Sequence, residues 1–352
     1  MRTIIFITES NDSAALAKRI QELGDRVILE SSLFTGPLYN PEVLSRVIKE
    51  RPELIIMDSD FEASTAAKTE FEKMGIPVYG TSLFSKSATK NPAYISKILN
   101  INGIKTEAIP KDTIPLTYSV VLNGKNKVMS SVFYEYVYLM NDDVGPPAYM
   151  GSIGYFGDIS AIDQKMSAMV NALIKSGFSG KIDFQLRLGE DAWCAGVYFY
   201  FRWNTIYALL ENINMSPSEF FYQCSMNEPM RLKIKSPWSC QINCGVPPFP
   251  YNLEREEEAE IRGIDSNNSK HLWVRNFKNG DLMTVTGRGG YIREAKRRAY
   301  RTLSNLSTEG IMYRTDIGLN AVDKFREITK LGWIDLKEEQ LLEPFKANTI
   351  SR

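Results

Sequence analysis

Hydrophobic and polar positions follow two alternating patterns over the first hundred residues. Short apolar runs at 2–7, 26–29, 54–57 and 76–79 predict strands. Segments with helical spacing at 13–23, 41–49 and 63–74 lie between them, and Gly24 and Gly75 end two of these helices. Short apolar strands separated by helices predict a parallel sheet that helices cover on both faces.

The pattern changes beyond this point. Asn123-Gly124 lies between two apolar stretches and is a strong signal for a hairpin turn. Around it, the sequence predicts a helix at 91–100, a linker at 104–118, hairpin strands at 118–122 and 127–137, and a glycine-dense loop at 144–157. The sequence then predicts a helix at 161–175, strands at 180–188 and 193–201, and helices at 204–213 and 217–223. Beyond these it predicts further strands and helices at 291–306 and 320–331.

These elements predict an α/β protein with three domains and a tail. We expect an N-terminal parallel-sheet domain at 1–103 and a central α+β domain at 104–228. A small β-rich α+β domain at 229–330 and a polar tail at 331–352 complete the chain.

Composition narrows the function classes. Lys plus Arg (42) balance Asp plus Glu (42), so no global field favours nucleic acid, and no apolar run is long enough to span a membrane. A cytoplasmic protein is the resulting expectation. We expect Cys194, Cys224, Cys240 and Cys244 to be free thiols in the core or on the surface. A Cys/His zinc site is not expected, because the chain has the single histidine His271. His271 itself is expected in a strand rather than as a base.

Several blocks resemble phosphoribosylamine–glycine ligase, a purine-biosynthesis enzyme of the ATP-grasp superfamily. The resemblance rests on their shared order along the chain, since each block is weak alone. They are Ile76-Pro-Val-Tyr-Gly80, Gly103-Ile-Lys-Thr106, Gly145-Pro146 with Met150-Gly151, residues 181–190, residues 239–250, Thr284-Val-Thr-Gly-Arg-Gly289 and Tyr313-Arg-Thr-Asp-Ile-Gly318. The resemblance implies an ATP-grasp-like core in the central domain, with ATP and Mg²⁺ as cofactors.

The strand at 181–190 departs from the family at its metal ligands. Asp183 and Gln185 stand where the family has a glutamate and an asparagine that hold magnesium, and both side chains share one strand face. The resemblance therefore implies a metal site at Asp183 and Gln185, the alternative being a polar sheet face without a metal. Arg187 and Glu190 match an arginine and an acid of the family and are the candidate catalytic residues. Arg187 is expected to clamp a substrate carboxylate or phosphate, or to pair with Glu190.

A lid is missing from the expected place. ATP-grasp enzymes of this family close a small lid with phosphate-binding lysines over the nucleotide, between the blocks that match residues 103–106 and 145–151. Only residues 107–116 separate Thr106 from the hairpin here, which is too short for a domain. Without a lid the triphosphate loses charge neutralisation and water is not excluded, which argues against phosphoryl transfer.

The N-terminal loops also differ from the family. Residues 8–14 and 57–63 replace the loops that the family associates with its phosphosugar, and the second carries Asp58, Asp60 and Glu62. These acids disfavour a sugar phosphate at this point. They are expected to solvate a loop and cap a helix, with a cation or amine site as the alternative.

The glycine blocks supply candidate cofactor contacts. Gly287 and Gly289, with Arg288 between them, are expected to let backbone N–H groups approach an anion beside the basic helix at 291–306. Gly145 and Gly151 belong to the block that resembles the family's glycine-rich loop, which implies a cofactor contact there. The basic helix reads as a solvated face, the alternative being a patch for phosphate or nucleic acid.

Three functions remain open. The first is a diverged binding protein, or pseudoenzyme, for a nucleotide, a sugar phosphate or an amino-acid derivative, with ligase activity lost or altered. The second is an active carboxylate–amine ligase of altered substrate that forms an amide through an acyl phosphate, with its lid supplied by a neighbouring subunit. The third is an ATP-independent transferase that uses the same cleft. The expected partners are a small-molecule ligand and a second copy or another protein, with no membrane and no nucleic acid.

Overall fold

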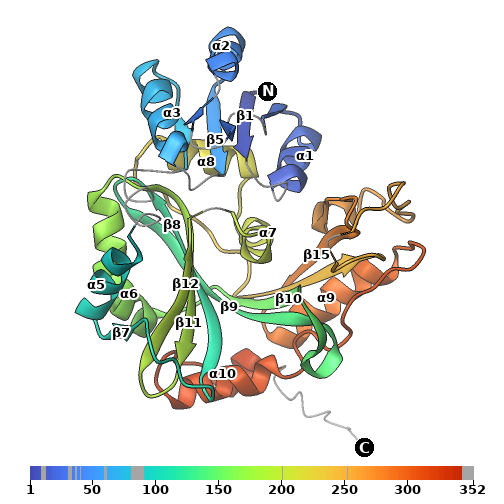
Figure 1. Ribbon diagram of the computed structural model, residues 1–352. Coiled ribbons are helices and arrows are strands. Elements are labelled where there is room, and N and C mark those ends of the chain that lie inside the picture. The colour runs from blue at the N-terminus through green and yellow to red at the C-terminus, as the bar shows by residue number, and fades with distance from the viewer. Residues whose placement is uncertain are drawn as a thin grey trace, which may run out of the picture.

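The computed structural model describes residues 1–8, 13–30, 34–35, 38–39, 41–58, 62–80, 91–199, 201–251 and 253–342. Two sheets organise this part of the chain, a small parallel sheet from the N-terminal residues and a nine-stranded sheet from the rest (Figure 1). No helix within the described ranges is long and apolar enough to cross a membrane. Mixed α/β architecture is thus confirmed.

The N-terminal sheet has the parallel arrangement that the sequence predicts. Its strand order is β2-β1-β5-β6, with each neighbouring pair parallel. Its elements are β1 (Thr3–Thr8), α1 (Ala14–Glu22), β2 (Arg26–Glu30), α2 (Pro41–Glu50), β5 (Leu54–Asp58), α3 (Glu62–Lys73) and β6 (Val78–Tyr79), with a short pair β3 (Phe34–Thr35) and β4 (Leu38–Tyr39) beside them. The apolar runs form strands because β1 and β5 are buried on both faces.

The larger sheet crosses the predicted boundary at residue 228. Its strand order is β14-β15-β13-β10-β9-β8-β11-β12-β7. The strands are β7 (Ile104–Lys105), β8 (Ile114–Asn123), β9 (Lys127–Met140), β10 (Val144–Tyr155), β11 (Ser179–Leu188), β12 (Ala192–Tyr198), β13 (Trp238–Gly245), β14 (Leu272–Val274) and β15 (Asp281–Gly289). Since β10 pairs with β13, the central and C-terminal segments share one sheet, and the predicted domain boundaries stay a prediction.

Helices cover this sheet on more than one side (Figure 1). They are α5 (Pro92–Ile101), α6 (Ser160–Lys175), α7 (Trp203–Asn212), α8 (Pro217–Ser225), α9 (Ile292–Ser304), α10 (Ala321–Lys330) and α11 (Glu338–Leu341), with 3-10 turns η2 (Asn141–Asp143) and η3 (Ser269–His271). α5 and α6 pack together, α9 packs against β13 and β15, and α7 contacts β10, β13 and β15. α8 contacts β5 and β6, which joins the two sheets.

The glycine-dense loop predicted at 144–157 is instead mainly strand β10. Its glycines serve close packing. A Cβ on Gly151 would lie 2.4 Å from the Gln241 carbonyl oxygen, and one on Gly154 would lie 2.5 Å from the Phe133 ring. Glycine density here reflects neighbours pressed against the strand, a situation that the sequence alone does not distinguish from a loop.

Two further predictions need correction. The linker predicted at 104–118 contains β7 and the first half of β8, because buried Ile114, Leu116 and Tyr118 follow strand alternation despite Pro115. The tail predicted from residue 331 packs onto the core as far as Leu342. Trp333 and Leu341 are buried there, so the apolar residues scattered among polar ones anchor the segment.

All four cysteines are buried and free of disulfides. Burial raises the pKa of Cys194 and of Cys240 to about 12, so their thiolates are scarce at any pH below that value. We expect none of the four to react with Ellman's reagent in the native protein at pH 8, and all four to react in denaturant. Rapid reaction of one thiol in the native state would contradict the buried placement.

Candidate functional site

The predicted metal ligand Asp183 lies on β11 in a fully buried ion pair. The Lys181 Nζ is 2.5 Å from the Asp183 Oδ1, and both side chains are inaccessible to solvent. The Thr205 hydroxyl donates to the other carboxylate oxygen at 2.7 Å. Burial lowers the pKa of Lys181, and the adjacent carboxylate opposes that shift. Protein donors therefore hold both oxygens of the carboxylate.

A second buried carboxylate, Glu135 on β9, lies beside this pair. Arg202 places its Nη2 at 3.1 Å from the Glu135 Oε2, Asn204 donates to the same oxygen at 3.0 Å, and Thr117 donates to Oε1 at 2.6 Å. The Arg202 Nη1 is 4.0 Å from the Asp183 Oδ2, so the two carboxylates share this cation. The amino end of α7 thus supplies the partners of both acids.

The structure brings together some of the other predicted residues. Gln185 and Arg187 line a cavity of about 300 Å³, together with Glu135, between β8, β9 and β11. Gln185 accepts from the Tyr198 hydroxyl at 3.2 Å. Glu190 is exposed at the turn after β11 and forms no ion pair with Arg187. Within the described ranges, no group of three or more His, Cys, Asp and Glu side chains could hold a metal ion, and the metal role of Asp183 and Gln185 stays a prediction.

Among the acids Asp58, Asp60 and Glu62 predicted in the N-terminal loop, Asp58 has protein partners in the structure. Asp58 is buried at the end of β5, where it accepts from the Ser13 hydroxyl and, at 2.6 Å, from the Phe201 backbone N–H. The carboxylate therefore joins the N-terminal sheet to the segment that precedes α7. Asp60 lies outside the described residues, and Glu62 begins α3.

The candidate cofactor glycines serve chain packing. Gly145 is the second residue of β10 and has φ +93°, and Gly151 faces β13 as described above. A Cβ on Gly287 would lie 2.5 Å from the Ala299 nitrogen, and one on Gly289 would lie 2.7 Å from the Ala295 nitrogen, so both glycines let α9 approach β15. The N–H of the next glycine, Gly290, donates to the Glu294 carboxylate at 2.7 Å. A cofactor contact at these glycines stays a prediction.

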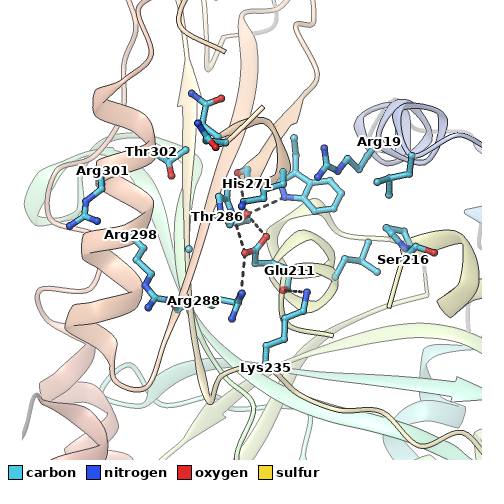
Figure 2. A pocket seen from close by; sticks show the side chains of 18 of the residues that line it. Arg19, Glu211, Ser216, Lys235, His271, Thr286, Arg288, Arg298, Arg301 and Thr302 are labelled. Atoms are coloured by element: carbon cyan, nitrogen blue, oxygen red, sulfur yellow. Dashed lines mark hydrogen bonds and ion pairs between the residues drawn. The ribbon is translucent and has the colours of Figure 1, made fainter. Parts of the chain in front are cut away.

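Gly287 and Arg288 also line a larger cavity of about 700 Å³ (Figure 2). Here the His271 Nδ1 is 2.9 Å from the Glu211 Oε1, and the Arg288 Nε is 3.5 Å from the same oxygen. His271 was expected in a strand. It is instead the last residue of η3, directly before the first residue of β14. Sequence reasoning missed Glu211 and Lys235 altogether, because residues so far apart along the chain leave no spacing signal.

The comparisons with known proteins identify the fold. No family model and no curated protein matches the chain. Urea carboxylase from Kluyveromyces lactis superposes with a TM-score of 0.61 at 8% identity, over 95% of this chain and 32% of that one, so this chain spans about a third of that enzyme. Phosphoribosylamine–glycine ligase from Thermotoga maritima gives 0.53 at 16% identity, over 90% and 100%.

A third structure is a biotin carboxylase from Campylobacter jejuni in complex with β,γ-ATP. It gives a TM-score of 0.57 at 8% identity, over 88% of this chain and 92% of that one. Identities at this level establish likeness of fold alone. The chain has the fold of the ATP-grasp ligases.

Proposed function

We propose that this protein binds a small anionic molecule on an ATP-grasp ligase fold and does not carry out magnesium-dependent ligation. The observation that carries the proposal is the buried Lys181–Asp183 ion pair. A ligase of this class needs a carboxylate that is available to a cation bound on the triphosphate. Asp183 instead has its charge balanced by the protein itself.

The residues present do not fit Mg²⁺. This ion prefers near-octahedral oxygen coordination at about 2.0–2.1 Å and keeps several waters. Lys181 and Thr205 contact one Asp183 oxygen each, and the carboxylate is fully buried. A magnesium ion at Asp183 would have to displace the ammonium of Lys181. The displaced ammonium would then be a buried charge without a partner, which costs several kcal/mol.

Residues 106–113 connect β7 to β8 and are too few to form a lid over a triphosphate. Phosphoryl transfer depends on positioning and on charge neutralisation in a site that excludes water. Lys105, at the end of β7, pairs with Asp191 at the surface, and the connection itself contains one cation, the exposed Lys111. This short connection supports binding without phosphoryl transfer.

Arg187 is the group in the central cavity that would hold an anion. It lines the 300 Å³ cavity with Gln185, and the two carboxylates of the lining, Glu135 and Asp143, are each paired with an arginine. A guanidinium offers two parallel N–H donors to a carboxylate or phosphate. The ligand classes that fit are a nucleotide, a sugar phosphate or an amino-acid derivative.

Isothermal titration with ATP, in the presence and in the absence of Mg²⁺, tests this proposal. We expect any binding of ATP to be the same with and without the ion, and no ADP to form on incubation with amines and carboxylates. Arg187→Gln should lower the affinity of the central cavity for any anion that it binds.

Magnesium-dependent ATP binding that is lost in Asp183→Ala would contradict the proposal. It would favour the active ligase of altered substrate, with a lid from another subunit. Asp183→Asn, which keeps the shape of the side chain, would separate loss of charge from loss of packing in that case.

A further inference from the structure

The larger cavity is a second, separate feature of the molecule. It lies between α1, the carboxyl end of α7, β15 and α9, and Figure 2 shows Arg19, Lys235, Arg288 and Glu211 around it. Thr205, which contacts Asp183, and Glu211, which faces this cavity, lie on one helix and roughly 9 Å apart along its axis at about 1.5 Å per residue. The cavity is therefore distinct from the cluster around Asp183.

Positive charge is concentrated in its lining. The chain as a whole has a formal net charge of zero. The cations of the lining are Arg19, Lys235, Lys270, Arg288, Arg298 and Arg301, whereas its carboxylates are Glu211 and Asp265. Asp265 is occupied by the backbone N–H groups of Asn267 and Asn268, at 2.8 and 2.9 Å. Clefts lined by one sign of charge attract ligands of the other sign.

Lys235 and Arg288 form the centre of this charge. Both side chains make long contacts with Glu211, since the Lys235 Nζ is 3.4 Å from its carbonyl oxygen and the Arg288 Nε is 3.5 Å from its carboxylate. Burial lowers the pKa of Lys235, and the nearby charge of Arg288 adds to that shift while Glu211 opposes it. An anion between the two cations would relieve their repulsion.

The remaining cations have their own partners or lie farther out. Arg298 pairs with Glu294 at 2.6 Å, and Arg19 donates to the Ser269 carbonyl at 3.3 Å. Arg301 lies on the exposed side of α9, and Lys270 is exposed in η3. These residues add to the positive potential at the mouth, so the contact with a ligand falls to Lys235 and Arg288.

We infer that this cavity binds a small molecule bearing a phosphomonoester, with the phosphate held between Lys235 and Arg288. A dianion matches the two cations, and a guanidinium binds phosphate oxygens in a bidentate manner. Leu210, Met215 and Trp273 give the body of the ligand an apolar wall. A volume of about 700 Å³ falls within the usual range for small-molecule sites, about 300–1,000 Å³.

Isothermal titration of the full-length protein with ribose 5-phosphate, inorganic phosphate and ribose tests the inference. We expect ribose 5-phosphate to bind, inorganic phosphate to bind more weakly and to compete with it, and ribose to give no heat. Arg288→Gln and Lys235→Met should each weaken ribose 5-phosphate binding at least tenfold. The matched control is Arg297→Gln, which removes the same charge from an exposed position of α9 outside the cavity and should change the affinity less than twofold.

Three results would overturn the inference. These are the absence of binding by both phosphate compounds, equal weakening by Arg288→Gln and Arg297→Gln, and tighter binding of a short RNA that Arg297→Gln abolishes. Thermal unfolding midpoints of the variants show whether each is folded. A magnesium-dependent ATP site elsewhere would contradict the proposed function and leave this inference standing, because the two sites use different residues.

Discussion

Lys181→Met is expected to lower the free energy of unfolding by about 3–5 kcal/mol. The substitution keeps the length of the side chain but leaves the buried Asp183 carboxylate with Thr205 and, at 4.0 Å, Arg202 as its remaining polar partners. An uncompensated buried charge costs far more than the net contribution of the original pair. Urea denaturation followed by tryptophan fluorescence measures the change.

A surface pair with the same separation provides the control. Lys105 lies 2.5 Å from Asp191, as Lys181 does from Asp183, but both side chains are more than half exposed. Lys105→Met should therefore cost less than about 1 kcal/mol. Adding Asp183→Leu to Lys181→Met should recover most of the lost stability, because an apolar replacement of both partners removes the unpaired charge. Similar losses in the two lysine variants would show that Asp183 is solvated.

Gly287→Ala is expected to lower the free energy of unfolding by about 3 kcal/mol, the upper end of the usual range for an overpacked interior. The added Cβ would lie 2.5 Å from the Ala299 nitrogen and 2.6 Å from the Ala295 carbonyl oxygen. Both contacts are to helix backbone, which cannot rotate away as a side chain can. α9 would have to move off β15, and thermal unfolding should record the loss.

Gly290→Ala is the matched control. A Cβ at Gly290 would meet only the Glu294 Oε2, at 3.6 Å, which is ordinary contact. This variant should lie within about 0.5 kcal/mol of the wild type. If Gly287→Ala proved equally mild while it weakened binding of an anion, the cofactor role expected for this glycine would regain support.

Local pattern was sufficient for much of the fold. The N-terminal strands and helices follow from apolar runs and glycine stops, and the hairpin of β8 and β9 follows from Asn123-Gly124. These elements depend on residues close in sequence, where periodicity carries the signal. β10 escaped prediction because its glycines meet partners such as Gln241 that are distant along the chain.

The candidate sites show the same limit. The sequence places Lys181, Asp183 and Gln185 on one face of a strand, so this pairing was within reach of local pattern. The complete burial of the pair, with Thr205 of α7 donating to Asp183, appears only in the folded structure. Glu211, Lys235, His271 and Arg288 come together through folding alone. Charges that meet across the tertiary structure leave no periodic trace, so Glu211 and Lys235 escaped prediction, whereas Arg288 was expected beside an anion.

The pairing of β10 with β13 has a practical consequence for dissecting the protein. Five residue pairs, from Gly151 with Ile242 to Tyr155 with Trp238, join the two segments in mid-sheet. A truncation at residue 228 would leave the backbone of β10 as an open edge, and such edges template aggregation. Fragments made separately would be insoluble or would recombine on mixing, so functional dissection of this chain is better done with point variants than with isolated domains.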